Sequence, residues 1–184
     1  AAITALTTAQ ISELSTSALN ALSTAQLAAL EVADVAALTT AQVSKLSGEQ
    51  LSKLNNEQIV ALTTSQVQAL TKNQLTSLTT GQLNNMAAED LQALTTAQLR
   101  ALSTGQVSNL IAEQLNRMTT AQLQALGTEQ VVALTSGQLN AMTTSNLTSL
   151  TTTQVSKLTT GQISQLSQEQ VRALTTSQVS AMTT

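Results

Sequence analysis

The sequence predicts an all-α protein, a repeat solenoid built from very short capped helices, with one helix in every eight residues. Leu or Met occupies every eighth position from Leu6 to Met182, and Val, Leu or Ile follows five residues later in each repeat. Between these aliphatic positions most repeats carry Ser or Thr and, three residues on, Gln. Acidic residues gather at the start of the repeat and basic residues at its end. The chain is one octapeptide, L-T-T-x-Q-V-x-A, repeated along residues 1–184.

The spacing of the aliphatic residues excludes the two regular alternatives. With the Leu numbered position 1, the aliphatic residues stand at positions 1 and 6, separated alternately by five and three residues. Both separations are odd, whereas a strand needs even separations to keep both residues on one face. In an unbroken helix, eight residues overshoot two turns by about 80°, so the apolar stripe would leave the core within a few octads. A helix that restarts in every octad satisfies the spacing.

Positions 2 and 5 carry the signal for a helix start. Position 2 is Ser or Thr in eighteen of twenty-three octads, and position 5 is Gln in eighteen of twenty-two. A Ser or Thr followed three residues later by Gln is the capping box, in which each side chain bonds the other residue's backbone N–H. We therefore predict a helix from position 3 to about position 8. The exceptions at position 5 are Ala18, Asp34, Asp90 and Asn146, and those at position 2 are Glu31, Asn55, Ala87, Ile111 and Gly127.

The placement of charge supports these helix boundaries independently. Nine of the ten acidic residues fall at positions 2 to 5, and six of the seven basic residues fall at positions 7 and 8. The helix dipole favours acids near the N-terminus and bases near the C-terminus. Only Glu13 and Lys72 depart from this pattern. Position 7, as at Arg100 and Ser108, is expected to be exposed and to tolerate replacement by Ala.

Helices of about six residues are too short to be stable alone, so the octads must stack into a compact coil. Small residues at position 8 cluster, as at Ala61 and Ala69, and alternate with clusters of bulkier residues, as at Lys45 and Lys53. The alternation recurs every four to five octads. Our hypothesis is that one superhelical turn takes about four to five octads and has one open side and one crowded side.

The composition excludes most catalytic chemistry. The chain has no His and no Cys, so neither a Ser-His nor a Cys-His arrangement can form. The adjacent Ser and Lys residues are interpreted as helix ends, because neighbouring residues on a helix point apart. These pairs are Ser44-Lys45, Ser52-Lys53 and Ser156-Lys157. We expect no catalytic residue and no enzymatic activity.

The densest carboxylates are Glu31 with Asp34 and Glu89 with Asp90, and both pairs lie at predicted helix starts. They lack the closely spaced oxygen ligands of a calcium loop, so we expect no metal site. The six glycines also lie near helix starts, without a phosphate-binding motif, so we expect no nucleotide or other cofactor. A small-molecule ligand is not expected.

Charge and hydropathy bear on the remaining partners. A net charge of −3 and the absence of aromatic residues argue against nucleic-acid binding. No run of apolar residues is long enough to span a membrane. Asn146-Leu147-Thr148 forms an N-glycosylation sequon, which chance alone explains in a repeat of this composition. Residues 1–184 form a single array of about 23 octads, expected to be a segment of a longer chain because it begins at Ala1 rather than Met.

The unit L-T-T-A-Q-[VIL]-x-A, present at Leu6–Glu13, Leu38–Lys45 and Leu94–Ala101, resembles octapeptide arrays of large, repetitive bacterial surface and adhesin-like proteins. The resemblance covers essentially the whole chain and implies an extracellular location. The leading interpretation is a structural protein that forms a filament, sheath, stalk or spacer, with other copies of itself as partners. The alternative is a repetitive binding scaffold whose Thr and Ser rows contact polysaccharide, a partner protein or ice.

Overall fold

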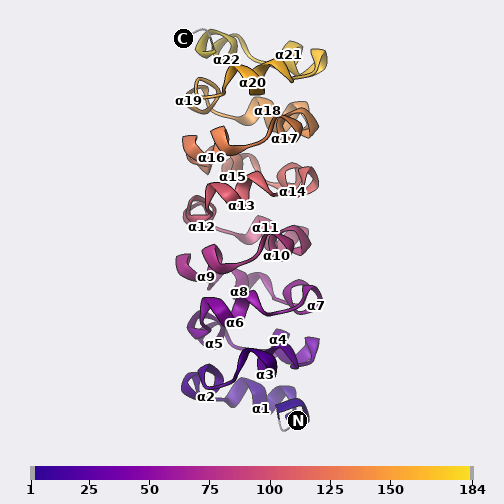
Figure 1. Ribbon diagram of the computed structural model, residues 1–184, viewed down its shortest axis with the longest axis vertical. Helices are drawn as coiled ribbons and strands as arrows, with labels where there is room; N and C mark the ends of the chain where they lie inside the picture. Colours follow the sequence, from indigo (N-terminus) through magenta and orange to yellow (C-terminus); the bar gives the residue numbers. More distant parts are fainter. Residues whose placement is uncertain (1–2, 183–184) are drawn as a thin grey trace. The chain divides into compact units, whose positions relative to one another are not determined.

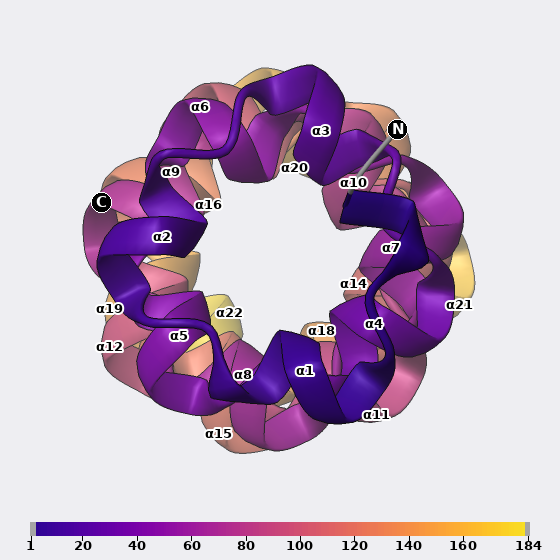
Figure 2. The ribbon, with the colours of Figure 1, turned by 90° about the horizontal axis from the view of Figure 1, so that it is seen from below.

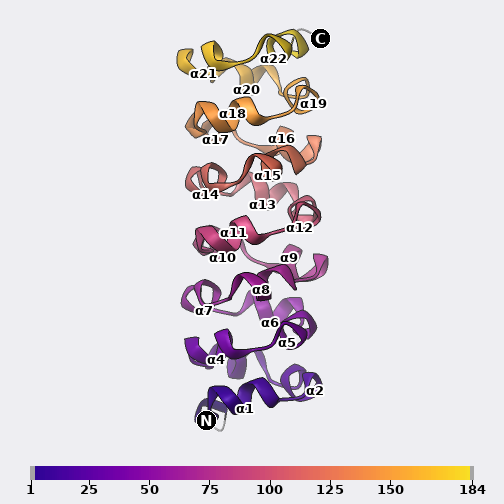
Figure 3. The same ribbon diagram turned by 180° about the vertical axis from the view of Figure 1, so that it is seen from behind.

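The computed structural model describes residues 3–182, and within this range the secondary structure is entirely helical (Figures 1 and 3). The chain divides into two compact units, the first ending at Leu94 and the second beginning at Thr95. Both units are built in the same way, as an unbroken succession of α-helices of four to six residues. The predicted all-α repeat solenoid is confirmed.

Each α-helix begins at position 3 of its octad, directly after the residue at position 2. The N-terminal unit contains η1 (Ile3–Ala5), α1 (Thr8–Glu13), α2 (Thr16–Asn20), α3 (Thr24–Ala28), α4 (Val32–Ala37), α5 (Thr40–Lys45), α6 (Gly48–Ser52), α7 (Asn56–Val60), α8 (Thr64–Gln68), α9 (Lys72–Ser77), α10 (Thr80–Asn85) and α11 (Ala88–Ala93). The C-terminal unit contains α12 (Thr96–Ala101), α13 (Thr104–Ser108), α14 (Ala112–Arg117), α15 (Thr120–Ala125), α16 (Thr128–Ala133), α17 (Ser136–Ala141), α18 (Thr144–Ser149), α19 (Thr152–Val155), α20 (Thr160–Ser164), α21 (Gln168–Ala173) and α22 (Thr176–Ala181).

Two consecutive extended residues turn the chain from one helix into the next. At the end of α9, Leu78 has φ −61° and ψ 135°, and Thr79, which caps α10, has φ −71° and ψ 157°. The Leu78 N–H still donates to the Leu75 carbonyl over 3.2 Å, which ends the helix tightly. Because no residue between 3 and 182 has a positive φ, the connection between two helices needs no glycine. Eight residues are therefore sufficient for one helix and its connection to the next.

The two aliphatic positions form the core of each unit, as the sequence predicts. At position 6, every side chain from Ile11 to Val155 is at most 2% exposed. At position 1, every side chain from Leu30 to Leu150 is at most 5% exposed. Position 5 is also buried in most octads, although it carries a polar side chain.

Within each unit the helices follow one another around a coil, as Figure 2 shows for α1 to α4. Helices on successive turns are three octads apart: α6 packs on α9 in the N-terminal unit, and α13 packs on α16 in the C-terminal unit. Side-chain hydrogen bonds also reach back 28 and 31 residues, to the helix four octads earlier. One turn therefore takes between three and four octads, fewer than the expected four to five.

One residue at position 8 makes a close contact with the preceding turn. Ser77 at position 8 lies against Gly48, which is at position 3 three octads earlier. A Cβ added to Gly48 would lie 2.1 Å from the Ser77 hydroxyl oxygen, so this pair admits no side chain at Gly48. At this pair, position 8 of one turn is in direct contact with position 3 of the preceding turn.

Candidate functional site

The most elaborate side-chain chemistry in the chain is at position 5, where Gln first completes the cap of its own helix. In α10 the Gln82 N–H donates to Thr79 Oγ1 over 3.1 Å, and the Thr79 N–H donates to Gln82 Oε1 over 2.9 Å. The same reciprocal pair is present in most helices of both units, with Asn55 in place of Ser or Thr in α7. The predicted capping box is confirmed.

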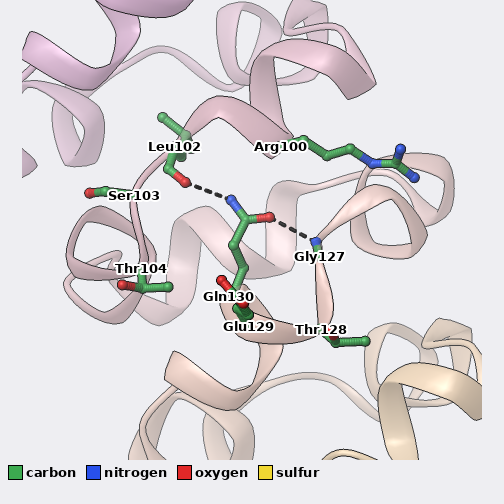
Figure 4. Close-up of a pocket in the computed structure, with 8 residues that line it drawn as sticks. All are labelled: Arg100, Leu102, Ser103, Thr104, Gly127, Thr128, Glu129 and Gln130. Atoms are coloured by element: carbon green, nitrogen blue, oxygen red, sulfur yellow. Dashed lines mark hydrogen bonds between the residues drawn. The ribbon is translucent and has the colours of Figure 1, made fainter.

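The remaining amide group of Gln binds the preceding turn, a contact that the sequence did not reveal. Gln82 Nε2 donates to the carbonyls of Leu51 and Leu54, at 2.8 and 2.9 Å. Gln130 Nε2 donates to Leu99 and Leu102 in the same way, at 2.9 and 2.8 Å. Figure 4 shows the Gln130 side chain between two backbone groups: its Nε2 donates to the Leu102 carbonyl, and its Oε1 accepts a hydrogen bond from the Gly127 N–H. We call this set of contacts the glutamine joint.

The glutamine joint satisfies backbone groups that would otherwise be buried without partners. The last carbonyls of an α-helix have no intrahelical donor, and here they lie at positions 6 and 1, where the chain enters the core. One buried amide therefore holds together the start of its own helix and the end of a helix on the preceding turn. Because an unsatisfied buried polar group costs about 1–3 kcal/mol, the joint contributes both stability and the register of the coil.

Side chains other than Gln at position 5 show how specific the joint is. Asn146, one methylene shorter, donates from Nδ2 to the Asn116 carbonyl at 3.1 Å and to the Leu115 carbonyl at 3.4 Å. The amide of the Asn146 sequon is thus part of the coil. Asp34 and Asp90 at position 5 are buried, and a carboxyl group in this place has a hydrogen to donate only when it is protonated. Burial, and next the charge of Glu89, raises the pKa of Asp90 to about 6.

Polar residues at position 7 form a second set of contacts between turns, here to a later helix. Arg100 Nε donates to the Ala125 carbonyl over 2.8 Å, and Gln124 Nε2 donates to the Ser149 carbonyl over 3.0 Å. Asn116 Nδ2 binds the Ala141 carbonyl over 2.9 Å. The acceptors are position 8 carbonyls 25 residues later, at the ends of their helices. Arg100 is exposed, as expected, but its side chain also makes a hydrogen bond between turns that the sequence did not indicate.

A surface hollow of about 510 Å³ lies beside the joint of Gln130 in the C-terminal unit, between two successive turns (Figure 4). Its lining includes Arg100, Ser103, Thr104 and Glu129. A smaller hollow, lined by the equivalent residues Asn140, Thr143, Thr144 and Glu169, lies five octads later. The hollows follow the repeat and contain hydroxyl groups together with an exposed acid, without a nucleophile paired to a base.

The Ser-Lys pairs have the arrangement expected of helix ends. The hydroxyls of Ser44, Ser52 and Ser156 donate to backbone carbonyls three residues earlier, at 2.8–2.9 Å. They are therefore engaged within their own helices. For the acidic pairs, the structure between residues 3 and 182 brings no three His, Cys, Asp or Glu residues together in a group that could hold a metal ion.

The geometry of both units defines a class: an α-helical repeat coil whose successive turns are joined by buried glutamine amides. A family model described as the ALTTAQ repeat matches residues 1–32, 27–64, 83–120 and 112–144, more than half of the chain. The chain belongs to the ALTTAQ repeat family. No curated protein matches it. Within the described residues, none of the helices is long and apolar enough to cross a membrane.

Proposed function

We propose that the chain is a structural protein of the cell surface or extracellular space, acting as a filament, sheath, stalk or spacer rather than as an enzyme. The observation that carries this proposal is the recurrence of the glutamine joint at successive turns of both units. Each turn presents the next with the same carbonyls and the same aliphatic positions, so the coil extends by adding octads. The extracellular location rests on the resemblance to octapeptide arrays of bacterial surface proteins.

Val171 and Val179 show which aliphatic residues a further turn of the coil would cover. Val171 and Val179, at position 6 of α21 and α22, are 49% and 46% exposed. Val155 at the same position of α19 is fully buried, because a further turn packs on it. We propose that further octads cover Val171 and Val179 in the same way, whether these octads follow in the same chain or come from a second copy that associates head to tail. Such head-to-tail contacts do not close on themselves and produce filaments.

Sedimentation of residues 1–184 across a concentration series, with electron microscopy of the same samples, tests this function. We expect the average mass to rise with concentration and ordered filaments to form. Val171→Asp and Val179→Asp should abolish both effects, because each buries a charge in the contact. Val32→Asp is the matched control, since Val32 is similarly exposed, at 43%, but lies on α4. A folded monomer at every concentration would overturn self-association and leave a passive spacer.

A further inference from the structure

Asp90 lies where the repeat places an amide that joins two turns. It occupies position 5 of α11 and is only 5% exposed. Gln66 at the same position binds carbonyls 31, 30 and 28 residues earlier. By this register, position 90 corresponds to the end of α7, where the equivalent carbonyls are those of Ile59, Val60 and Leu62. The cap of α11 is also weakened, because Ala87 at position 2 forms no side-chain hydrogen bond. The side chain at position 90 is therefore the main polar link available to this helix start.

The chain contains an internal precedent for a short side chain in this place. Asn146 bridges to the carbonyls 31 and 30 residues earlier, so a side chain of this length reaches the preceding turn when it can donate. A protonated aspartic acid has the same length as Asn and one O–H to donate. An ionised Asp90 would instead direct its negative charge at carbonyl oxygens.

We propose that the joint between α7 and α11 is closed by a protonated Asp90, which donates a hydrogen bond to the Ile59 or Val60 carbonyl, and that it loosens when Asp90 ionises. The turn between α7 and α11 is thereby pH-sensitive, whereas the joints made by amides, such as those of Gln66 and Gln82, have hydrogen bonds that do not titrate. The raised pKa of Asp90, about 6, agrees with this geometry.

Within the N-terminal unit, the helices next to Asp90 (α7, α8 and α10) and α11 itself carry no positive charge that could neutralise an ionised carboxylate. Glu89 precedes it on α11, and Glu57 on α7 is exposed. The adjacent helices α8 and α10 of the same unit carry no charged residue. The nearest charges of the following unit in sequence are Arg100 on α12 and Glu113 and Arg117 on α14. Within the N-terminal unit, burial and the charge of Glu89 therefore favour the neutral acid, and the exposed Glu57 makes no such contribution.

The sign of the pH effect follows from the pKa. Since the folded-state value, about 6, exceeds the ordinary value of 3.8, folding favours the protonated form. The stability that Asp90 contributes is complete below about pH 4, falls as the pH rises to about 6, and stays low above it. The effect of Asp90 is therefore measured as the difference in stability between the wild type and a variant at each pH.

Carbon-13 NMR titration of the full chain tests the proposal. We expect the Asp90 carboxyl and the backbone carbonyl carbons of Ile59 and Val60 to shift together with a midpoint near pH 6. In Asp90→Asn the carbonyl shifts should lose this transition, and the melting temperature relative to wild type should rise between pH 4 and pH 7. Asp90→Gln provides a second neutral variant that restores the consensus residue.

Glu57→Gln is the control, because it removes an exposed acid from α7 and should leave the midpoint unchanged. The proposal is overturned if Asp90 titrates near pH 4, or if the Ile59 and Val60 carbonyls do not follow its titration. It is equally overturned if Asp90→Asn keeps the pH dependence of the wild type. The titration of the wild type decides the question even if a variant fails to fold.

Discussion

The side-chain amide of Gln66 donates to the backbone carbonyl of Leu38, 2.6 Å away and 28 residues earlier in the chain. The same Gln66 accepts a hydrogen bond from the Thr63 N–H over 2.8 Å and so caps α8. One side chain thus sets where a helix begins and which earlier helix it lies beside. The local repeat and the coil are coupled through this residue type.

Replacing Gln66 by Met should destabilise the N-terminal unit by about 2–3 kcal/mol, because the Thr63 N–H loses its acceptor and two buried carbonyls lose a donor. Gln10→Met provides the control, since Gln10 is exposed and caps α1. This change should cost about 0.5–1 kcal/mol, because only the acceptor of the Thr7 N–H is lost. Urea unfolding measures both variants. Equal losses would show that the contact to the preceding turn contributes nothing.

Arg100→Ala should destabilise the C-terminal unit by about 0.5–1.5 kcal/mol, because its Nε–H binds the Ala125 carbonyl on the next turn. Ser108→Ala at the same position of the following octad should have almost no effect. The Ser108 hydroxyl donates to the Gly105 carbonyl of its own helix, at an exposed site. Thermal unfolding measures both variants, and Arg100→Ala should have the lower melting temperature. Similar melting temperatures would show that the hydrogen bond from Arg100 to the next turn does not stabilise the unit.

Gly48→Ala and Gly105→Ala should change stability in opposite directions. A methyl group at Gly48 meets Ser77 on the next turn, so the turns must separate and about 1–3 kcal/mol is lost. At Gly105 the nearest atom, Ser103 Oγ, is 3.8 Å away, and the change gains about 0.5–1 kcal/mol of helix propensity. The free energies of unfolding of the two variants provide the check. Stabilisation by Gly48→Ala would contradict the packing of α6 on α9.

Much of the local structure could be predicted from the sequence because it depends on residues close together. The helix start follows from Thr79 and Gln82, three residues apart, and the core follows from positions 1 and 6. The contact from Gln82 to Leu51 could not be predicted, because it requires the number of octads per turn. That number depends on the angle between successive helices, which an eight-residue repeat does not report.

The position 7 contacts were missed for the same reason. The helix dipole alone accounts for a basic residue at a helix end. The position of Arg100 in the sequence therefore did not indicate its hydrogen bond to Ala125 on the next turn. The signal at Asp90 was similarly ambiguous. An acid in the first turn of a helix is ordinarily favourable, and only the burial of position 5 shows that this carboxyl faces the core.

Hydrogen exchange of glutamine side-chain amides tests the central claim, that buried amides join successive turns, most directly. The Nε2 hydrogens of Gln58 and Gln66 donate to carbonyls of the preceding turn, whereas Gln10 is exposed. We expect NMR to show exchange of the Gln58 and Gln66 hydrogens slowed at least about a hundredfold relative to Gln10, since exchange requires the turns to open. Equally rapid exchange at all three residues would contradict the account.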